Sequence, residues 1–346
     1  MAGMKKVPAL FLSVTALCFL ITVGTVRPES YMDSARINFF TEAQEYIFND
    51  RYEAADSAYA AHVERQPEDP AGYLFRAAGL MAEMSDREEN LRPDRFHALL
   101  NISDSLTLLI LDTCDNRTAA WMCLLRGHAQ AYRSLWESRF GSFLSAVKRG
   151  FAANGEYETG LKHDSTLIDL YAGIGSYHYW KSAKAGLLRL VGVFKNEKDK
   201  GIRELRNAAA NSLLHRELAR SALIWIWLDK QEYDSAAALA SEFVQKYPEG
   251  KTFLWPKAQA LFRRQEYRRA CEAYQELRTR LVEAPGNFYN LIEVDYYITQ
   301  AYNWMGQPEE ARKAAGRLME YYREIPDRTL KRQRSEINFL KRMIAR

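Results

Sequence analysis

Along the chain, apolar residues recur at the spacing that places them on one face of a helix, with polar residues between them. The C-terminal stretch shows this plainly, because Leu330, Ile337, Leu340 and Ile344 form one stripe with basic residues opposite. Glycine occurs only 18 times and proline 10 times, too rarely for the many tight turns of a β-sandwich. The pattern therefore predicts an all-α protein without a sheet.

A repeat with a step of 34 residues is visible in the second half of the chain. The tripeptide at 231–233, Gln-Glu-Tyr, recurs at 265–267, and each tyrosine is followed three residues later by an alanine, Ala236 or Ala270. A further unit begins near Ile292 and keeps the same internal spacing at Tyr302, Ala311, Ala315 and Leu318. Self-similarity at this step indicates stacked supersecondary units that share one core.

These residues resemble the tetratricopeptide repeat (TPR) family, whose unit is a pair of antiparallel helices. The resemblance implies that the alanines let the second helix of a pair approach the first closely, and that the preceding tyrosine closes the turn. Two positions depart from the family pattern: Ile224 replaces its small residue, and Pro308 replaces its turn tyrosine. The N-terminal end carries the same spacing at Ala43, Tyr46, Tyr52, Ala55, Tyr59 and Pro67.

We therefore expect a right-handed α-solenoid of about seven antiparallel helix pairs over residues 34–325. The clear repeats are 36–69, 217–250, 251–284 and 292–325. Longer, degenerate pairs are predicted within 70–213, near 70–113, 117–162 and 166–213. The segment 328–346 is predicted to be a capping helix that covers the last edge of the core.

The N-terminal segment, residues 1–26, carries a targeting signal. Lys5 and Lys6 precede an uncharged stretch that runs from Val7 to Val26. A basic region before an apolar one is typical of a secretory signal peptide, but about 20 residues is also the length of a membrane-spanning helix. The segment is therefore either a cleaved signal peptide or an N-terminal membrane anchor. Both alternatives predict an exported protein, periplasmic or membrane-anchored, with its body outside the cytoplasm.

Composition excludes several classes of protein. Hydrophobic residues make up 47% of the 346 positions, enough for a continuous core, so extensive disorder is not expected. The formal net charge of +4 gives no electrostatic reason to expect a nucleic-acid partner. No two cysteines form a C-x-x-C pair, which argues against zinc and thioredoxin-like chemistry. In an exported protein, Cys114 and Cys123 are either a disulfide or two small buried side chains.

Catalytic patterns are absent from the sequence. It contains no H-E-x-x-H, no G-x-S-x-G and no phosphate-binding loop of the G-x-x-x-x-G-K type. An S-x-x-K tetrapeptide at 145–148 lacks its partner motifs and is expected by chance. The six histidines include no pair at i, i+4 that would present two metal ligands on one helix face. We therefore predict a protein that is not an enzyme and that holds no cofactor or metal.

Aromatic residues supply the candidate site. In the TPR fold the first helices of the pairs line a concave surface, and by the repeat register several aromatic side chains point into it. Such a stripe would hold an extended apolar peptide or an amphipathic helix. The same rings would equally fill the interface between repeats, and the sequence leaves both alternatives open. The candidate partner groove consists of Tyr179, Trp180, Trp225, Trp255, Phe262, Tyr296 and Trp304.

The function predicted from these features is a protein–protein interaction scaffold of the cell envelope, with a protein or peptide partner. A membrane association through the N-terminus follows if that segment is an anchor. The alternative is a membrane-surface protein that contacts lipid through the apolar stretch 186–194 and the basic C-terminal residues from Arg328 to Arg346.

Overall fold

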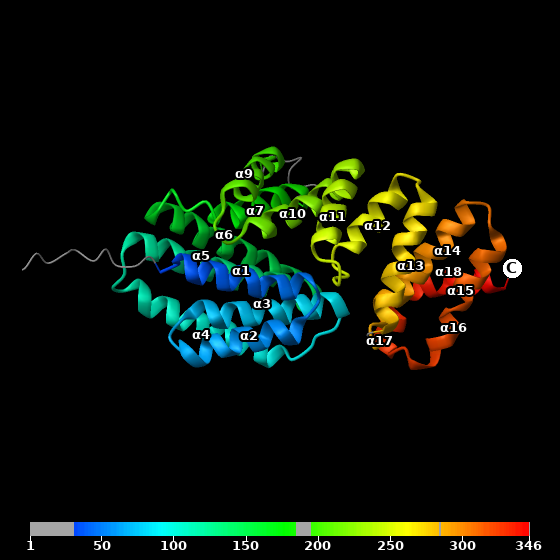
Figure 1. Ribbon diagram of the computed structural model, residues 1–346, viewed down its shortest axis with the longest axis horizontal. Coiled ribbons are helices and arrows are strands. Elements are labelled where there is room, and N and C mark those ends of the chain that lie inside the picture. The colour runs from blue at the N-terminus through cyan, green and yellow to red at the C-terminus, as the bar shows by residue number, and fades with distance from the viewer. Residues whose placement is uncertain (1–30, 185–194, 284, 346) are drawn as a thin grey trace, which may run out of the picture.

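The computed structural model describes residues 31–184, 195–283 and 285–345, and this part of the chain is helical without any strand. Seven antiparallel helix pairs follow one another in chain order (Figure 1). The pairs are α1 (Ser34–Phe48) and α2 (Tyr52–Arg65), α3 (Pro70–Arg87) and α4 (Pro93–Leu111), α5 (Asn116–Phe140) and α6 (Phe143–His163), α7 (Leu170–Lys184) and α9 (Lys198–Asn211), α10 (Arg216–Asp229) and α11 (Tyr233–Lys246), α12 (Leu254–Arg263) and α13 (Tyr267–Glu283), and α14 (Phe288–Trp304) and α15 (Pro308–Gly316). The predicted all-α solenoid is confirmed for the described residues.

Four of the pairs share one tight turn between their two helices. In each, a residue with positive φ stands two positions before the second helix: Asp50 at 58°, Gln231 at 61°, Gln265 at 64° and Gly306 at 71°. A backbone hydrogen bond closes the turn, as where Glu266 N donates to Leu261 O over 3.0 Å. This is the Schellman pattern, which satisfies the last carbonyl groups of a helix. The repeat that is visible in sequence thus corresponds to a repeated local geometry.

Small residues set the close approach of the helices. The alanines of the repeat pattern, Ala236, Ala270 and Ala311, are fully buried in the first turn of their helices. In the fourth pair glycines take this role, because a Cβ atom on Gly175 would lie 2.7 Å from the carbonyl oxygen of Gly201. A larger side chain at these positions would therefore separate the two helices.

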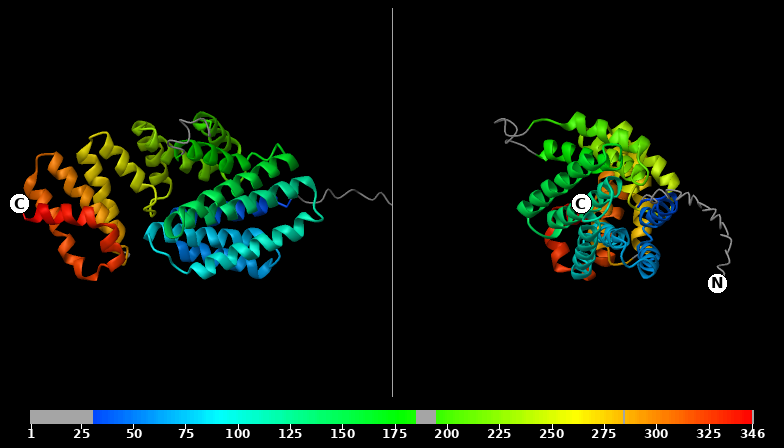
Figure 2. Two further views of the ribbon diagram at one scale, coloured as in Figure 1. Left: turned by 180° about the vertical axis from the view of Figure 1, so that it is seen from behind. Right: turned by 90° about the vertical axis from the view of Figure 1, so that its left-hand side faces the viewer.

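The first pair also packs against the middle of the array. The ring of Phe48, at the end of α1, lies 5.0 Å from that of Tyr247 and 5.7 Å from that of Phe253, between α11 and α12. Gly250 makes this approach close, since a Cβ atom there would lie 2.0 Å from the carbonyl oxygen of Phe48. Segments about 200 residues apart in sequence are therefore side by side, and Figure 2 shows the array from behind and from its end.

A buried group of charges holds the same junction. The Lys251 ammonium lies 2.8 Å from Asp50 and 3.2 Å from Asp86. Asp50 lies in the turn between α1 and α2, and Asp86 lies in α3. Further along, Asn287 donates to the carbonyl oxygen of Asp86 over 2.8 Å. Because each contact joins an early helix pair to a late one, the solenoid closes on itself.

The C-terminal cap differs from the single helix that was expected. It consists of α16 (Leu318–Tyr321), the 3-10 turn η1 (Tyr322–Glu324), α17 (Asp327–Arg332) and α18 (Arg334–Ile344). The break falls at buried Gln333, whose side chain donates to Tyr289 O over 3.2 Å. The predicted stripe does face inward, since Ile337 and Leu340 are buried where α18 packs on α14 and α15. The cap thus completes the core of the last pair.

Two segments of interest lie outside the described residues: the N-terminal stretch 1–26 and the apolar stretch 186–194. Among the helices of the described part, none combines the length and the apolar character needed to cross a bilayer.

Candidate functional site

The seven residues of the predicted groove fall into different environments. Tyr179 is completely buried, and its hydroxyl donates to Asp229 over 2.6 Å. It is therefore not a groove residue. The physical reason is Gly201, which lets α9 approach the backbone at Tyr179 so closely that the side chain is enclosed. Trp180 is half-buried, with the Lys184 ammonium 5.4 Å from its ring centre. Trp225 on α10 is 42% exposed.

The other four predicted residues gather in the C-terminal third of the chain. Trp304 is 65% exposed and stacks on Tyr267, with ring centres 6.2 Å apart and planes 13° from parallel. Tyr267 contacts Phe262 at 5.4 Å, and Phe262 contacts Tyr297 at 5.3 Å. Tyr297 in turn lies 5.3 Å from Tyr296. Trp304, Phe262 and Tyr296 are thereby linked through two tyrosines that were not among the predicted set.

One more ring completes this row of contacts. Phe339 on α18 lies 5.1 Å from Tyr296, edge to face. Every ring in the row is at least partly exposed. We name the row the C-terminal aromatic surface; it consists of Phe262, Tyr267, Tyr296, Tyr297, Trp304 and Phe339.

The repeat geometry explains how these side chains meet. Phe262 and Tyr267 stand on either side of the tight turn between α12 and α13, and Trp304 is the last residue of α14 at the equivalent turn. Neighbouring turns of stacked repeats lie side by side, so their aromatic residues come into contact. The repeat pattern predicts for Tyr267 only a role in closing its turn, and Phe339 lies off the apolar stripe of α18. Neither residue carried a signal of exposure.

Trp255 is half-buried, and its ring contacts a core residue rather than a member of this surface. Its ring is 6.2 Å from that of Tyr274, a fully buried residue of α13. Tyr274 stacks almost parallel on Tyr297, with ring centres 5.0 Å apart. Trp255 is therefore linked to the C-terminal aromatic surface through Tyr274. Within the predicted set, Tyr179 is a core residue and the others are at least partly exposed, so both alternatives that the sequence left open apply to different members.

A buried ion pair fixes α14, which carries three of the exposed rings. Asp295 is fully buried and accepts a hydrogen bond from Arg278 Nε over 2.7 Å and another from the Tyr321 hydroxyl over 2.9 Å. These bonds join α14 to α13 and α16. Because the partners lie on three helices, the rings on α14 are held by the interior of the fold.

One acidic side chain beside the rings has an altered acidity. Burial, with the nearby charges of Glu88 and Glu336, raises the pKa of Glu293 from 4.5 to about 7. Glu293 stands one helical turn from Tyr289 and Tyr297 on α14. Burial is also the main reason why the pKa of Tyr297 is raised above 10, so its phenol is neutral near pH 7. The rings therefore present a largely uncharged surface to a partner.

A second polar cluster lies sealed in the core. The rings of His128 and His215 are 4.6 Å apart, the Tyr157 hydroxyl lies 3.0 Å from His128 Nδ1, and Asp169 lies 3.1 Å from His215 Nδ1. Burial lowers the pKa of His128 well below 6.5. Burial would raise the pKa of Asp169, but hydrogen bonds from His215 and backbone amides lower it to about 2. All four side chains are buried, so the cluster braces neighbouring pairs and offers no access to a substrate.

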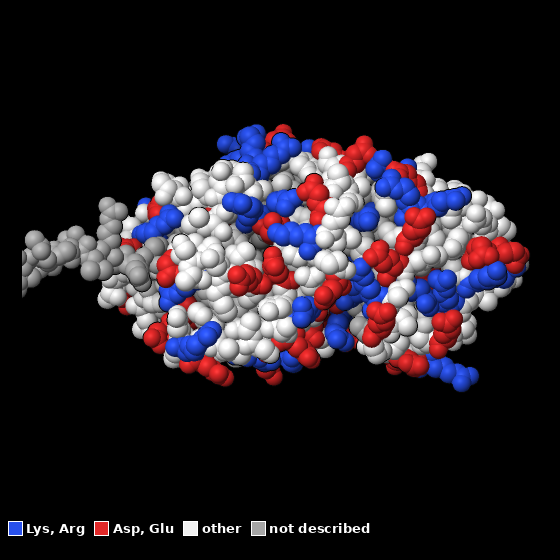
Figure 3. Space-filling view, in the orientation of Figure 1, with Lys and Arg blue, Asp and Glu red and all other residues white. Residues whose placement is uncertain are grey.

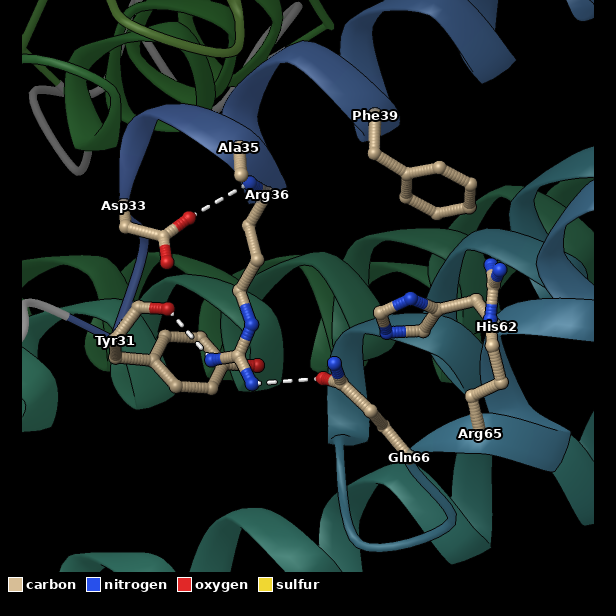
Figure 4. Close-up of a pocket in the computed structure, with 8 residues that line it drawn as sticks. All are labelled: Tyr31, Asp33, Ala35, Arg36, Phe39, His62, Arg65 and Gln66. Atoms are coloured by element: carbon tan, nitrogen blue, oxygen red, sulfur yellow. Dashed lines mark hydrogen bonds between the residues drawn. The ribbon is translucent and has the colours of Figure 1, made fainter.

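The pocket at the N-terminal end has a volume of about 550 Å³ and lies between α1 and α2 (Figure 4). Its main cation, Arg36, donates to Tyr31 O over 2.7 Å and to Gln66 over 2.8 Å. His62 Nε2 lies 2.8 Å from Asp69, and its ring stacks on Phe39. These groups are engaged with one another. In the described part of the chain no three histidine, cysteine or acidic side chains are grouped as metal ligands would be.

The cysteine alternatives are resolved by the structure: Cys114 and Cys123 are free thiols, and Cys123 is buried. Charge on the face drawn in Figure 3 is mixed, with basic and acidic side chains interspersed along the array.

The repeated helix pairs and their shared turn define an α-solenoid of tetratricopeptide type. Among solved structures, the C-terminal part of a TPR repeat-containing protein from Cytophaga hutchinsonii is similar, with 16% identity, a TM-score of 0.42, and coverage of 84% of this chain and 98% of that one. Yeast Tom70 is 12% identical with a TM-score of 0.40, over 91% of this chain and 65% of its own. The TPR domain of P58(IPK) is 11% identical with a TM-score of 0.25, over 89% and 98%. No protein-family model and no curated protein matches the sequence.

Proposed function

We propose that this chain is a non-catalytic protein–protein interaction scaffold of the cell envelope, and that its partner binds at the C-terminal aromatic surface. The observation that carries the proposal is the unbroken row of partly exposed rings that ends at Trp304. Tryptophan and tyrosine are enriched among the few residues that supply most of the binding energy at protein interfaces. A solenoid supplies such a surface because its successive helix pairs form an extended face for binding.

The chemistry of the surface indicates the kind of partner. The rings are neutral. Tyr297 stacks on buried Tyr274, and the hydrogen bonds of Asp295 hold α14, which carries three of the rings, against its neighbours. A peptide that presents apolar side chains along one edge, either extended or helical, would cover them. Because the rings are already ordered, little conformational entropy is lost when the partner binds.

The envelope location rests on Lys5, Lys6 and the uncharged stretch that follows them. A phosphatase that is active only outside the cytoplasm, fused after Arg346, should be active in this arrangement. An expressed but inactive fusion would show that the body stays in the cytoplasm and would remove this part of the proposal.

Binding is tested with two exposed tryptophans that differ in their surroundings. Trp304 belongs to the C-terminal aromatic surface, whereas Trp225 lies on α10 outside it. A photoreactive residue at Phe339 of the full chain, activated in membranes and followed by detergent extraction, should cross-link one defined protein. We expect Trp304→Ala to weaken binding of this partner by about 2 kcal/mol, roughly thirtyfold in affinity, and Trp225→Ala to leave the affinity unchanged.

Thermal melts supply the control for folding. Because Trp304 is 65% exposed, its truncation leaves no large cavity and should lower stability only slightly. Equal cross-linking by both variants, or recovery of lipid alone, would contradict a partner site at this surface.

Lipid contact through the basic C-terminus finds less support. Arg332 donates to Glu88 O over 3.0 Å, the Arg328 guanidinium lies 5.7 Å from the ring centre of Phe140, and Lys341 lies over Tyr322. These three cations are engaged within the molecule, whereas Lys331, Arg334 and Arg342 are exposed. The stretch 186–194 is outside the described residues. We therefore favour a protein partner over lipid contact at the C-terminus.

A further inference from the structure

The outer face of α6 carries large apolar side chains that are largely exposed, although the last of them, Phe151, contacts α7. Phe143 is 72% exposed and Leu144 is 77% exposed, at the start of the helix. Val147 and Phe151 follow at steps of four residues and are 41% and 46% exposed. This spacing places Phe143, Val147 and Phe151 on one stripe. We name these four residues the α6 outer face.

The opposite side of the same helix already supplies its share of the core. Ala146, Ala153 and Tyr157 are buried, and Tyr157 fits so tightly that a Cβ atom on Gly127 of α5 would lie 2.2 Å from its ring. Phe143 and Leu144, the most exposed residues on the outer side, therefore add little to the packing of α6. Together the four residues of the α6 outer face expose roughly 400 Å² of apolar surface, the size at which a patch on a protein usually has a function.

Basic side chains surround this apolar face. Between residues 138 and 155 the chain has Arg139, Lys148 and Arg149 and no acidic residue, and Arg139 pairs with Glu88. Lys148 and Arg149 are exposed, and Arg149 donates to Gln130 over 3.0 Å. The nearest acidic residues in sequence are Glu137, which accepts from the Ser142 amide, and Glu156, which pairs with Arg126 over 2.7 Å.

The neighbouring helix α7 continues the same combination. Phe151 contacts Tyr177 with ring centres 5.9 Å apart, and the Lys181 ammonium lies 5.0 Å from the Tyr177 ring centre. Lys181 also pairs with Glu197. Lys184 lies in the same way over Trp180. Aromatic rings with lysines beside them are typical of protein surfaces at the level of lipid headgroups.

We propose that the α6 outer face lies on an anionic lipid bilayer. Phe143 and Leu144 enter the boundary between headgroups and acyl chains, and Lys148 and Arg149 contact phosphate oxygens. An exposed helix of this kind binds membranes in two ways: its apolar residues are buried among the lipids, and its basic residues are attracted to anionic headgroups. This face belongs to the third pair and the C-terminal aromatic surface to the last two pairs and the cap, so the lipid contact does not rest on the proposed partner site.

A second exposed apolar pair offers a matched contrast. Leu108 and Leu109 on α4 are 51% and 68% exposed, but they stand between Asp104 and Asp112 and have no basic neighbour within four residues in sequence. Acidic residues are repelled by an anionic bilayer, so α4 should not contact it. Comparing α4 with α6 thus shows whether exposed apolar side chains are enough for lipid contact or whether basic neighbours are also needed.

The test uses the full chain with a fluorescent dye attached to Val147→Cys on α6 or to Ser105→Cys on α4. Cys18→Ala and Cys114→Ser remove the other thiols that a dye would reach. Vesicles of phosphatidylcholine, with or without roughly one-third phosphatidylglycerol, carry a doxyl-lipid quencher placed at the headgroup boundary. Quenching reports contact of the labelled helix with lipid, whatever holds the chain near the membrane.

We expect quenching at Val147→Cys with anionic vesicles, little with phosphatidylcholine alone, and little at Ser105→Cys with either. Phe143→Ser with Leu144→Ser should weaken the contact at least about tenfold, because burial of even one large apolar side chain contributes that much. Leu108→Ser with Leu109→Ser should leave it unchanged. High salt should reduce the contact, since about 1 M salt shortens the Debye length to about 3 Å.

Equal quenching at both dye positions, or equal quenching with and without phosphatidylglycerol, would overturn the proposal. Shielding of the dye that appears without vesicles and grows with protein concentration would also overturn it, because the face would then belong to a second copy of the chain. Loss of partner cross-linking by Trp304→Ala is a separate result, so failure of either proposal is seen independently.

Discussion

Glu293→Gln gives a quantitative test of the junction beside the C-terminal aromatic surface. The pKa of Glu293 is raised to about 7, first by burial and then by the negative charges of Glu88 and Glu336. Glu88 lies just after α3 and Glu336 lies on α18, so these charges meet only when the early and late parts of the array are in contact. The acidity of Glu293 therefore depends on the closed arrangement.

The size of the effect follows from linkage. A carboxyl group with a raised pKa binds more protons in the folded state than in the unfolded state, so the free energy of unfolding falls as the pH rises. The fall begins near the unfolded pKa of 4.5 and is complete above about 7. A difference of about 2.5 units corresponds to about 3 kcal/mol, and because Glu293 keeps some contact with water we expect about 2 kcal/mol.

The measurement is urea unfolding followed by circular dichroism at pH 5 and pH 8, for the parent and for Glu293→Gln. At pH 5 the folded-state Glu293 side chain is mostly neutral, so the two proteins should differ in stability by less than about 1 kcal/mol. At pH 8 the glutamine variant should be more stable by about 2 kcal/mol. Other groups, such as Asp86, whose pKa burial raises to about 6, affect both proteins equally. A gap between the two proteins that does not change with pH would refute this reasoning.

Four further substitutions test the packing and one of the shared turns. Gly250→Ala places a methyl group against the Phe48 carbonyl, so it should lower the free energy of unfolding by about 1–3 kcal/mol and enlarge the radius of gyration in solution scattering. Its control is Gly155→Ala, on an open helix face, which should raise the free energy of unfolding by about 0.5–1 kcal/mol. Gln265→Gly should raise the free energy of unfolding by about 1 kcal/mol, because the φ of 64° suits glycine; an unchanged chemical denaturation curve would count against strain at this turn. Ala270→Leu should lower stability by about 1–3 kcal/mol in thermal melts, and a variant that melts like the parent would show that this contact is not close.

The helix pairs could be predicted from sequence because their determinants are local. The turn at Gln231 and the turn at Gln265 share a backbone geometry and a tripeptide, so the repeat was visible without any tertiary information. The buried alanines after these turns carry the same signal. In the middle of the chain, glycines such as Gly175 and Gly201 replace them, and that substitution hides the repeat while it preserves the close approach.

The site could be predicted only in part, because its geometry depends on how successive pairs rotate. The helical offset of Tyr179 resembles that of an exposed position, yet the glycine contact between α7 and α9 encloses it. Phe339 joins the aromatic surface only because α18 folds back on α14, which a break at Gln333 permits. Small angles add up over several repeats, so contacts between distant pairs are not encoded in any one of them.

The contact between Phe48 and the residues around Gly250 changes what the first helix pair is. In an open array the first pair has one neighbour and is the place where opening by fluctuation begins. Here α1 is held by α2 on one side and by the turn after α11 on the other, through Lys251 and Asp50. Amide protons of α1 should then exchange with solvent as slowly as those of an internal helix. A protease should therefore cleave α1 only when the contact between α1 and the segment after α11 also opens.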